Sequence, residues 1–204
     1  MAGAHEHWQT VFATRAESEV SWYQPRLETS LRLITDAAAD RTSGIIDIGG
    51  GTSTLVDSLL DLGYSDLTVL DISEAALERA RARLGGRASE VDWIAADVTR
   101  WIPARQWQVW HDRAAFHFLT DIERQDAYIA ALKRATAPGA SVIIATFALD
   151  GPERCSGLPV QRYSPETLAA RLGPDFTLVS GRPEPHVTPK GAIQRFSYGL
   201  LKRH

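Results

Sequence analysis

Three consecutive glycines follow a short apolar segment that carries one carboxylate. The segment Ile45-Ile46-Asp47-Ile48 leads directly into Gly49, Gly50 and Gly51. Glycines after a buried strand let a ligand approach the backbone, beside the positive end of the helix that follows. A carboxylate within an apolar strand needs a cationic or hydrogen-bonding partner. We therefore expect a ligand-binding turn in which Asp47 meets an ammonium group of the ligand.

Two further carboxylates stand at the ends of the next two apolar segments. Asp71 ends the run LTVLD, where it is placed to accept both hydroxyls of a ribose. Asp97 follows the run VDWIAA, where it is placed to accept an adenine amino group, and Ile72, Ala96 and Val98 offer apolar neighbours for the base. Because ligands of open α/β sheets bind at the carboxyl ends of the strands, the three carboxylates are expected to converge on one crevice.

The elements that must position these residues alternate between apolar runs and helical patterns. This alternation is typical of an α/β fold, in which helices cover both faces of a parallel sheet. The expected strands are Gly44–Ile48, Leu67–Asp71, Val91–Ala95, Trp107–His111 and Ser141–Phe147, followed by a closing pair at Phe176–Val179 and Ile193–Leu201. The expected helices are Thr54–Leu62, Glu74–Leu84, Ile122–Thr136 and a short one after Ser164, with Ser73, Asp121 and Ser164 as N-caps.

We expect one domain over residues 1–204. Residues 1–43 predict a helical cap of one or two helices with an aromatic cluster, interrupted at Pro25. Residues 44–147 form the expected cofactor-binding core. Residues 148–204 begin with a loop rich in Gly and Pro and supply the acceptor side and the closing strands.

The order Asp47-x-Gly49-x-Gly51, then Asp71, then Asp97, resembles the class I S-adenosylmethionine-dependent methyltransferases. The resemblance implies S-adenosyl-L-methionine as cofactor, with its methionine end held by Asp47 and the glycines, its ribose by Asp71 and its adenine by Asp97. It also implies a Rossmann-like three-layer sandwich with a seven-stranded, mostly parallel sheet and an antiparallel last strand. A nicotinamide-dependent dehydrogenase is the main rival, disfavoured because Thr54 stands where the third glycine of its fingerprint belongs.

The segment after the fourth expected strand bears on the methyl acceptor. It reads Trp110-His111-Asp112-Arg113-Ala114-Ala115-Phe116 and lacks the D/N-P-P-Y/F motif of enzymes that methylate nucleic-acid amino groups. It is similar to the W-D-R-G-A segment of thiopurine and small-thiol or halide methyltransferases, with His111 as an extra residue. The resemblance implies a small-molecule acceptor, with a thiol or inorganic sulfide favoured, and Trp110 is expected on the cofactor side.

Three side chains are candidates for the chemistry of transfer. A cation stabilises a thiolate, so Arg113 is expected to position a sulfur acceptor. An amine or hydroxyl acceptor would need a base, for which His111 and His117 are the candidates. Structural alternatives stay open, in which Arg113 pairs with Asp112 and His117 is a satisfied helix residue.

A second resemblance concerns the N-terminal aromatic residues. Ser21-Trp22-Tyr23 looks like the W-Y segment of lysine methyltransferases that act on translation factors and citrate synthase, although those enzymes carry D-K-G-T where this chain has Asp112-Arg113-Ala114-Ala115. Trp22 and Tyr23 are expected to close over the methionine end of the cofactor, with packing of an amphipathic helix as the alternative. The functional alternatives are therefore a protein-lysine methyltransferase and a cofactor-binding module without activity.

Composition sets the remaining expectations. The net charge is −3 and no basic run stands out, so neither a nucleic-acid backbone nor an anionic membrane is an expected partner. The single cysteine, Cys155, suits a reducing compartment, and we expect a cytoplasmic protein in which this thiol is incidental. We expect no metal ion, and a homodimer is possible.

Overall fold

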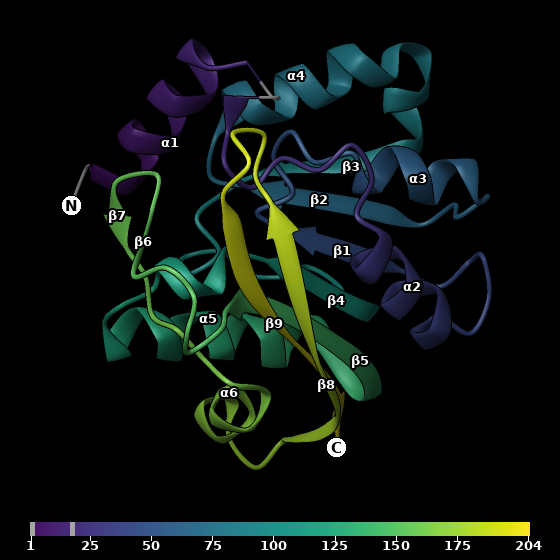
Figure 1. The fold of residues 1–204 in the computed structure, drawn as a ribbon. Helices are drawn as coiled ribbons and strands as arrows, with labels where there is room; N and C mark the ends of the chain where they lie inside the picture. The colour runs from purple at the N-terminus through teal and green to yellow at the C-terminus, as the bar shows by residue number, and fades with distance from the viewer. Residues whose placement is uncertain (1–2, 17–18) are drawn as a thin grey trace.

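A seven-stranded sheet in the order β3-β2-β1-β4-β5-β9-β8 forms the centre of the computed structural model, which describes residues 3–16 and 19–204 (Figure 1). Parallel pairs join β1, β2, β3, β4 and β5, whereas β9 runs antiparallel to both β5 and β8. The expected Rossmann-like fold with an antiparallel last strand is confirmed. The strands are β1 (Ile45–Ile48), β2 (Leu67–Asp71), β3 (Val91–Ala95), β4 (Trp107–Arg113), β5 (Thr136–Phe147), β8 (Phe176–Val187) and β9 (Ile193–Arg203).

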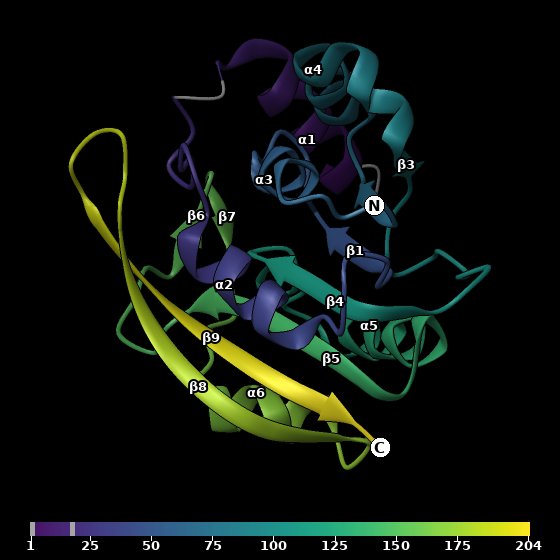
Figure 2. The ribbon, with the colours of Figure 1, turned by 90° about the vertical axis from the view of Figure 1, so that its right-hand side faces the viewer.

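Helices cover both faces of this sheet and make the three layers. One apolar core lies between the sheet and α2 (Glu28–Ala37), α3 (Leu55–Asp61) and α4 (Glu74–Leu84). The other core lies between the sheet and α5 (Ile122–Ala135) and α6 (Pro165–Leu172). Figure 2 shows α2 lying across the sheet, and α1 (Gly3–Thr14) beside α4. Among the described residues, short 3₁₀ helices form at η2 (Gly85–Glu90) and η3 (Phe116–Phe118).

Side-chain caps define where three of these helices begin. The Ser73 hydroxyl accepts a hydrogen bond from the backbone N–H of Ala76, and the Asp121 carboxylate accepts one from that of Arg124. Ser164 caps α6 in the same way, with Pro165 in the first turn. All three caps were expected, because each of these side chains satisfies an N–H group that the first helical turn leaves without a backbone acceptor.

The C-terminal hairpin of β8 and β9 is longer than expected from the sequence. Its partners run from Phe176–Arg203 to Val187–Ile193, and its tip projects beyond the sheet in Figure 2. Pro183 and Pro185 interrupt the row of N–H groups on the exposed edge strand β8, which opposes pairing with another chain. The hairpin brings residues near the C-terminus against the N-terminal segment that leads into α2.

The loop after β5 contains a small hairpin of its own, made by β6 (Arg154–Cys155) and β7 (Leu158–Pro159). Cys155 is buried within it. Across residues 3–16 and 19–204, no helix is both long and apolar enough to span a bilayer. In the same residues, no cluster of three or more His, Cys, Asp or Glu side chains is arranged to hold a metal ion.

Candidate active site

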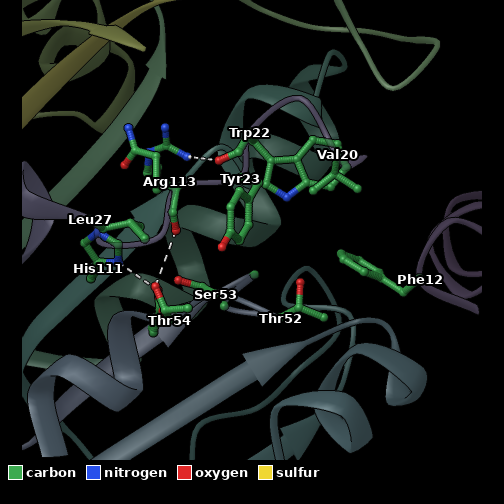
Figure 3. A pocket seen from close by; sticks show the side chains of 15 residues that line it. Phe12, Val20, Trp22, Tyr23, Leu27, Thr52, Ser53, Thr54, His111 and Arg113 are labelled. Carbon is green, nitrogen blue, oxygen red and sulfur yellow. Dashed lines mark hydrogen bonds and ion pairs between the residues drawn. The ribbon is translucent and has the colours of Figure 1, made fainter. Parts of the chain in front are cut away.

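A pocket opens at the carboxyl ends of β1 and β4, where the glycine turn begins (Figure 3). Its walls come from Phe12 of α1, from residues of the segment 20–27, from Asp47 and the turn 49–54, and from His111 and Arg113 at the end of β4. This is the edge of an open α/β sheet at which ligands bind. The pocket therefore joins the predicted glycine turn to the predicted acceptor-side residues.

The turn has no room for side chains at its centre. A Cβ atom on Gly50 would lie 2.7 Å from Asp47 Oδ2 and 2.8 Å from Val69 Cγ1. Gly51 has a φ of +46°, a left-handed conformation, and a Cβ there would lie 3.0 Å from Asp71 Oδ2. The turn thus presents bare backbone between two carboxylates, which is the cradle that a nucleoside with an amino-acid tail requires.

Asp71, at the end of β2, is buried and lies beside this turn. Its Oδ1 accepts a hydrogen bond of 2.8 Å from the backbone N–H of Ser73. Burial raises the pKa of this carboxyl from its ordinary 3.8 to about 7, with a smaller contribution from the charge of Asp47 and an opposing one from the bond to Ser73. A buried carboxylate without a cation is stabilised by hydroxyl donors, and ribose hydroxyls are such donors, although Asp71 does not line the pocket.

Helix α1 closes over the same site. Gln9 Oε1 accepts hydrogen bonds from the Ser73 hydroxyl at 2.5 Å and from the backbone N–H of Ala75 at 3.1 Å. Phe12 lies beside Gly51, with 3.4 Å between its Cζ atom and the position of a Cβ there. Ile72, which follows Asp71 in the sequence, is half-buried. Gln9 carried no signal in the sequence, because its partners lie more than sixty residues away.

Asp97 follows β3, which is the next strand of the sheet. The backbone N–H and the hydroxyl of Thr99 both donate to its Oδ1, at 2.9 and 2.7 Å. Arg124 lies 3.5 Å from Oδ2, and Val98 is half-buried against the apolar core. Asp97 is thus held in a turn at the sheet edge, on the strand beyond Asp71, as an adenine ligand would need, although it does not line the pocket.

The side chains of β4 point alternately to the two faces of the sheet. His111 and Arg113 face the core under α2 and line the pocket, whereas Trp110 and Asp112 face α5. We expected Trp110 beside the cofactor, but the structure places it in the core, where its indole N–H donates to the Tyr128 hydroxyl at 2.9 Å. The two-residue period of a strand explains this correction.

Asp112 accepts hydrogen bonds from the backbone that follows β4 and does not pair with Arg113. Its carboxylate accepts hydrogen bonds from the N–H groups of Ala115 and Phe116 and from the Tyr128 hydroxyl at 2.7 Å. Burial raises the pKa of this carboxyl to about 6 against those bonds. Ala114, which follows the last residue of β4, has a φ of 71°, so the backbone turns sharply at the end of the strand. The ion pair between Asp112 and Arg113 that the sequence left open is absent.

His111 is engaged at both ring nitrogens. Its Nδ1 lies 2.7 Å from Asp47 Oδ1 and its Nε2 lies 2.9 Å from the Ser30 hydroxyl. The residue is 1% exposed. It supports the carboxylate of the glycine turn, and neither nitrogen is available to take a proton from an acceptor in this arrangement.

Arg113 is the cation of the pocket. Its Nε donates to the Tyr198 hydroxyl at 3.2 Å, one terminal nitrogen donates to the backbone oxygen of Trp22 at 3.2 Å, and the other lies 3.7 Å from Glu184 without a hydrogen bond. The guanidinium carbon is 4.2 Å from the centre of the Phe196 ring. The side chain is 5% exposed, so its charge acts in a region of low dielectric.

His117 lies in η3 and does not line the pocket. It is fully buried, with its ring 4.4 Å from that of Phe118 and 4.9 Å from that of Phe147. Burial, followed by the charge of Arg113, lowers the pKa of this imidazole to about 3. Its Nδ1 accepts a long bond from the Phe147 N–H, at 3.4 Å, and its Nε2 has no partner. The site of the expected base is therefore inside the core.

The segment that contains Trp22 and Tyr23 crosses the pocket as a strap, here defined as residues 20–25. Gln24 donates to Glu184 at 3.1 Å, His186 of β8 donates to the Ser21 backbone oxygen at 2.7 Å, and Thr54 of the glycine turn donates to the Pro25 backbone oxygen at 3.1 Å. Figure 3 shows the Trp22 and Tyr23 side chains over the turn. Both residues line the pocket.

A family model described as a methyltransferase domain matches residues 45–139, just under half of the chain. Among curated proteins, the chain is similar to the eEF1A lysine and N-terminal methyltransferase of Mus musculus, with 29% identity over 123 residues. That match covers 59% of this chain and 17% of the relative, so the chain corresponds to a small part of the relative's length.

Solved structures share the fold over nearly the whole chain. One, from work on the conversion of a disulfide bond into a thioacetal group during echinomycin biosynthesis, has a TM-score of 0.74 at 21% identity and covers 98% of this chain and 92% of its own. The N-methyltransferase NodS of Bradyrhizobium japonicum in complex with S-adenosyl-L-homocysteine has a TM-score of 0.63 at 17% identity. Its match covers 86% of this chain and 84% of the NodS chain. At these identities the likeness establishes the fold. Over residues 45–139 the chain is thus similar to a methyltransferase domain.

Proposed function

We propose that this chain transfers a methyl group from S-adenosylmethionine to the sulfur of a small thiol or of inorganic sulfide. The observation that carries the choice of acceptor is the buried guanidinium of Arg113, which lies in the same pocket as the glycine turn. A fixed cation at low dielectric favours an anionic nucleophile over a neutral or cationic one.

The cofactor is assigned to the carboxylates of three neighbouring strands. Asp71 holds the ribose, Asp97 the adenine, and the glycine turn with Asp47 the methionine end. When bound, the cofactor supplies an electrophilic methyl group on a sulfonium. The protein's own part is to orient the acceptor and to keep it deprotonated.

The groups near the turn favour an acceptor that ionises without help. His111 is bonded at both nitrogens, Asp112 points to the other face, and His117 lies in the core. The pKa of a thiol in water is about 8.5, and a neighbouring cation lowers it, whereas the pKa of a lysine ammonium group is about 10.4. Arg113 therefore stabilises a thiolate and disfavours entry of a lysine ammonium group.

The strap supplies the exclusion of water. Trp22 packs against Trp8 and Phe12 of α1, with ring centres 5.7 and 6.2 Å apart. This apolar cover strengthens the electrostatic interactions of Arg113 with an anion beneath it. A cytoplasmic, reducing location belongs to the same proposal, because it keeps thiols available as acceptors.

A protein lysine is the second candidate acceptor. The observation in its favour is the 29% identity to the eEF1A lysine and N-terminal methyltransferase of Mus musculus. A module that binds the cofactor without turnover is the third possibility, and it predicts tight binding with no methylated product.

One assay separates the three. The full chain is incubated with S-adenosylmethionine labelled on the methyl group and with sulfide, methanethiol or benzenethiol, and, in a parallel reaction, with a cell lysate. We expect labelled thioethers and thiols, reduced at least tenfold by Arg113→Met, which keeps an unbranched, flexible side chain and removes the charge. A labelled protein band without labelled small molecules would move the assignment to lysine, and no label in either fraction would favour the inactive module.

A further inference from the structure

Four hydrogen bonds form an unbroken chain between the two charged groups of the pocket. Arg113 Nε lies 3.2 Å from the Tyr198 hydroxyl, which lies 3.1 Å from the Ser30 hydroxyl. Ser30 is 2.9 Å from His111 Nε2, and His111 Nδ1 is 2.7 Å from Asp47 Oδ1. The chain passes from β9 to α2 and back to β4 and β1, so it connects elements that are far apart in sequence.

The direction of every bond follows from its two ends. A guanidinium only donates, so the Tyr198 oxygen accepts and its own proton goes to Ser30. Ser30 then donates to His111 Nε2, which leaves the proton of His111 on Nδ1, where it donates to Asp47. The opposite direction would leave the Tyr198 proton without an acceptor in the chain. The chain is therefore polarised from cation to carboxylate, and such bonds strengthen one another.

The chain also decides which oxygen of Asp47 remains available. Oδ1 is taken by His111, whereas Oδ2 lies beside Gly50, at 2.7 Å from the position of a Cβ atom there. Asp47 is 6% exposed and lines the pocket. One carboxylate oxygen is thus held at the turn where the ammonium group of a methionine tail is expected.

Stability alone does not explain this arrangement. Ser30, His111 and Tyr198 are at most 1% exposed and lie in the apolar layer between α2 and the sheet. Buried polar groups cost free energy unless every partner is satisfied, and apolar residues of similar volume serve a core at least as well. A polar chain that ends on a pocket carboxylate is instead what orientation of that carboxylate requires.

We propose that Ser30 and Tyr198 are positioning residues for the cofactor, which act through His111 to orient Asp47 toward the ammonium group of its methionine tail. This inference rests on the proposed cofactor role of the pocket and not on the choice of acceptor. It replaces the role of catalytic base that the sequence suggested for His111. It also makes the last strand of the sheet part of the cofactor site.

Two ligands distinguish orientation of Asp47 from a structural role. S-adenosylhomocysteine carries the ammonium group, and 5′-methylthioadenosine carries the same nucleoside and a thioether without the amino-acid tail. We expect Tyr198→Phe and Ser30→Ala to weaken S-adenosylhomocysteine binding, measured by calorimetry, roughly three- to tenfold, which is the effect of about one hydrogen bond. Binding of 5′-methylthioadenosine should stay within about twofold, since it makes no contact that Asp47 controls. The control Tyr64→Phe, at another buried tyrosine, should change neither affinity.

The same titrations contain the results that overturn the inference. Equal losses of affinity for both ligands would assign Ser30 and Tyr198 a structural role. Unchanged affinity for S-adenosylhomocysteine would show that the four hydrogen bonds play no part in cofactor binding. Binding of 5′-methylthioadenosine reports folding of each variant, and either variant alone decides the outcome. If the unmodified chain binds neither ligand, the proposed function fails together with the inference, whereas failure to methylate thiols leaves the inference intact.

Discussion

Replacement of Asp71 by Asn should stabilise the ligand-free protein, and increasingly so as the pH rises. The carboxyl is buried without a cationic partner, and its pKa is raised by burial from 3.8 to about 7. Below pH 3.8 the group is protonated in both the folded and the unfolded chain and costs nothing. Between the two values only the unfolded chain ionises freely, so the folded state loses stability with rising pH.

The magnitude follows from the two pKa values. The full cost above pH 7 is roughly 4 kcal/mol, of which about 2 to 3 kcal/mol develops between pH 5 and pH 8. Asn keeps an oxygen that can accept the Ser73 N–H and never ionises. The difference in the free energy of unfolding between Asp71→Asn and the unmodified chain should therefore grow by roughly that 2 to 3 kcal/mol over this range.

Equilibrium unfolding in urea at pH 5 and pH 8 measures this difference. The control Asp36→Asn, at an exposed position of α2, should give the same small difference at both pH values. Saturating S-adenosylhomocysteine should reverse the order of stability at pH 8, because ribose hydroxyls stabilise the carboxylate. A difference for Asp71→Asn that is equal at pH 5 and pH 8 would refute the argument that burial of this carboxyl is an electrostatic cost.

Three further outcomes follow from the geometry. Gly50→Ala should lower S-adenosylhomocysteine affinity at least tenfold in calorimetry, because its Cβ would meet Asp47 Oδ2 at 2.7 Å. The control Gly86→Ala, with open space around it, should leave the affinity unchanged. Equal affinities of the two variants would contradict the close approach at Gly50. His117→Phe should reduce the loss of stability on acidification. The pKa of His117 is about 3 in the folded protein, so below pH 6.5 the imidazole takes up a proton in the unfolded chain but not in the folded one, which favours unfolding. Urea unfolding at pH 5 and pH 7 measures this loss, and an unchanged acid sensitivity would count against a buried neutral imidazole. Ala114→Gly should raise the free energy of unfolding by about 1 kcal/mol, because the φ of 71° strains alanine, and a loss of stability in urea would contradict that strain.

The fold was largely predictable because its signals are local. β2, β3 and α4 have the expected bounds, since each is a short apolar or periodic run between clear turns. The hairpin of β8 and β9 extends further than its apolar residues, because backbone pairing, and not burial, continues β8 through exposed residues to Val187. Local composition carries little information on such pairing.

The site was predictable only where its residues lie on one stretch of chain or at strand ends. Asp47 and the glycine turn lie where the spacing predicts. Trp110 lies in the core and not beside the cofactor site, because the two-residue period of the strand turns it to the face opposite His111 and Arg113. Ser30 and Tyr198 had no signal at all, since His111 lies 81 residues from its partner Ser30, and the contact between Ser30 and Tyr198 spans 168 residues.

The proposed function requires that the turn at Gly49–Gly51 and the carboxylates of β1, β2 and the end of β3 hold one S-adenosylmethionine molecule. Calorimetric titration of S-adenosylhomocysteine into the unmodified chain and into Asp71→Ala tests it most directly. We expect saturable binding at one site per chain, lost or weakened at least tenfold in the variant because both ribose hydroxyls lose their acceptor. Absence of binding to the unmodified chain, or equal binding to both proteins, would contradict it.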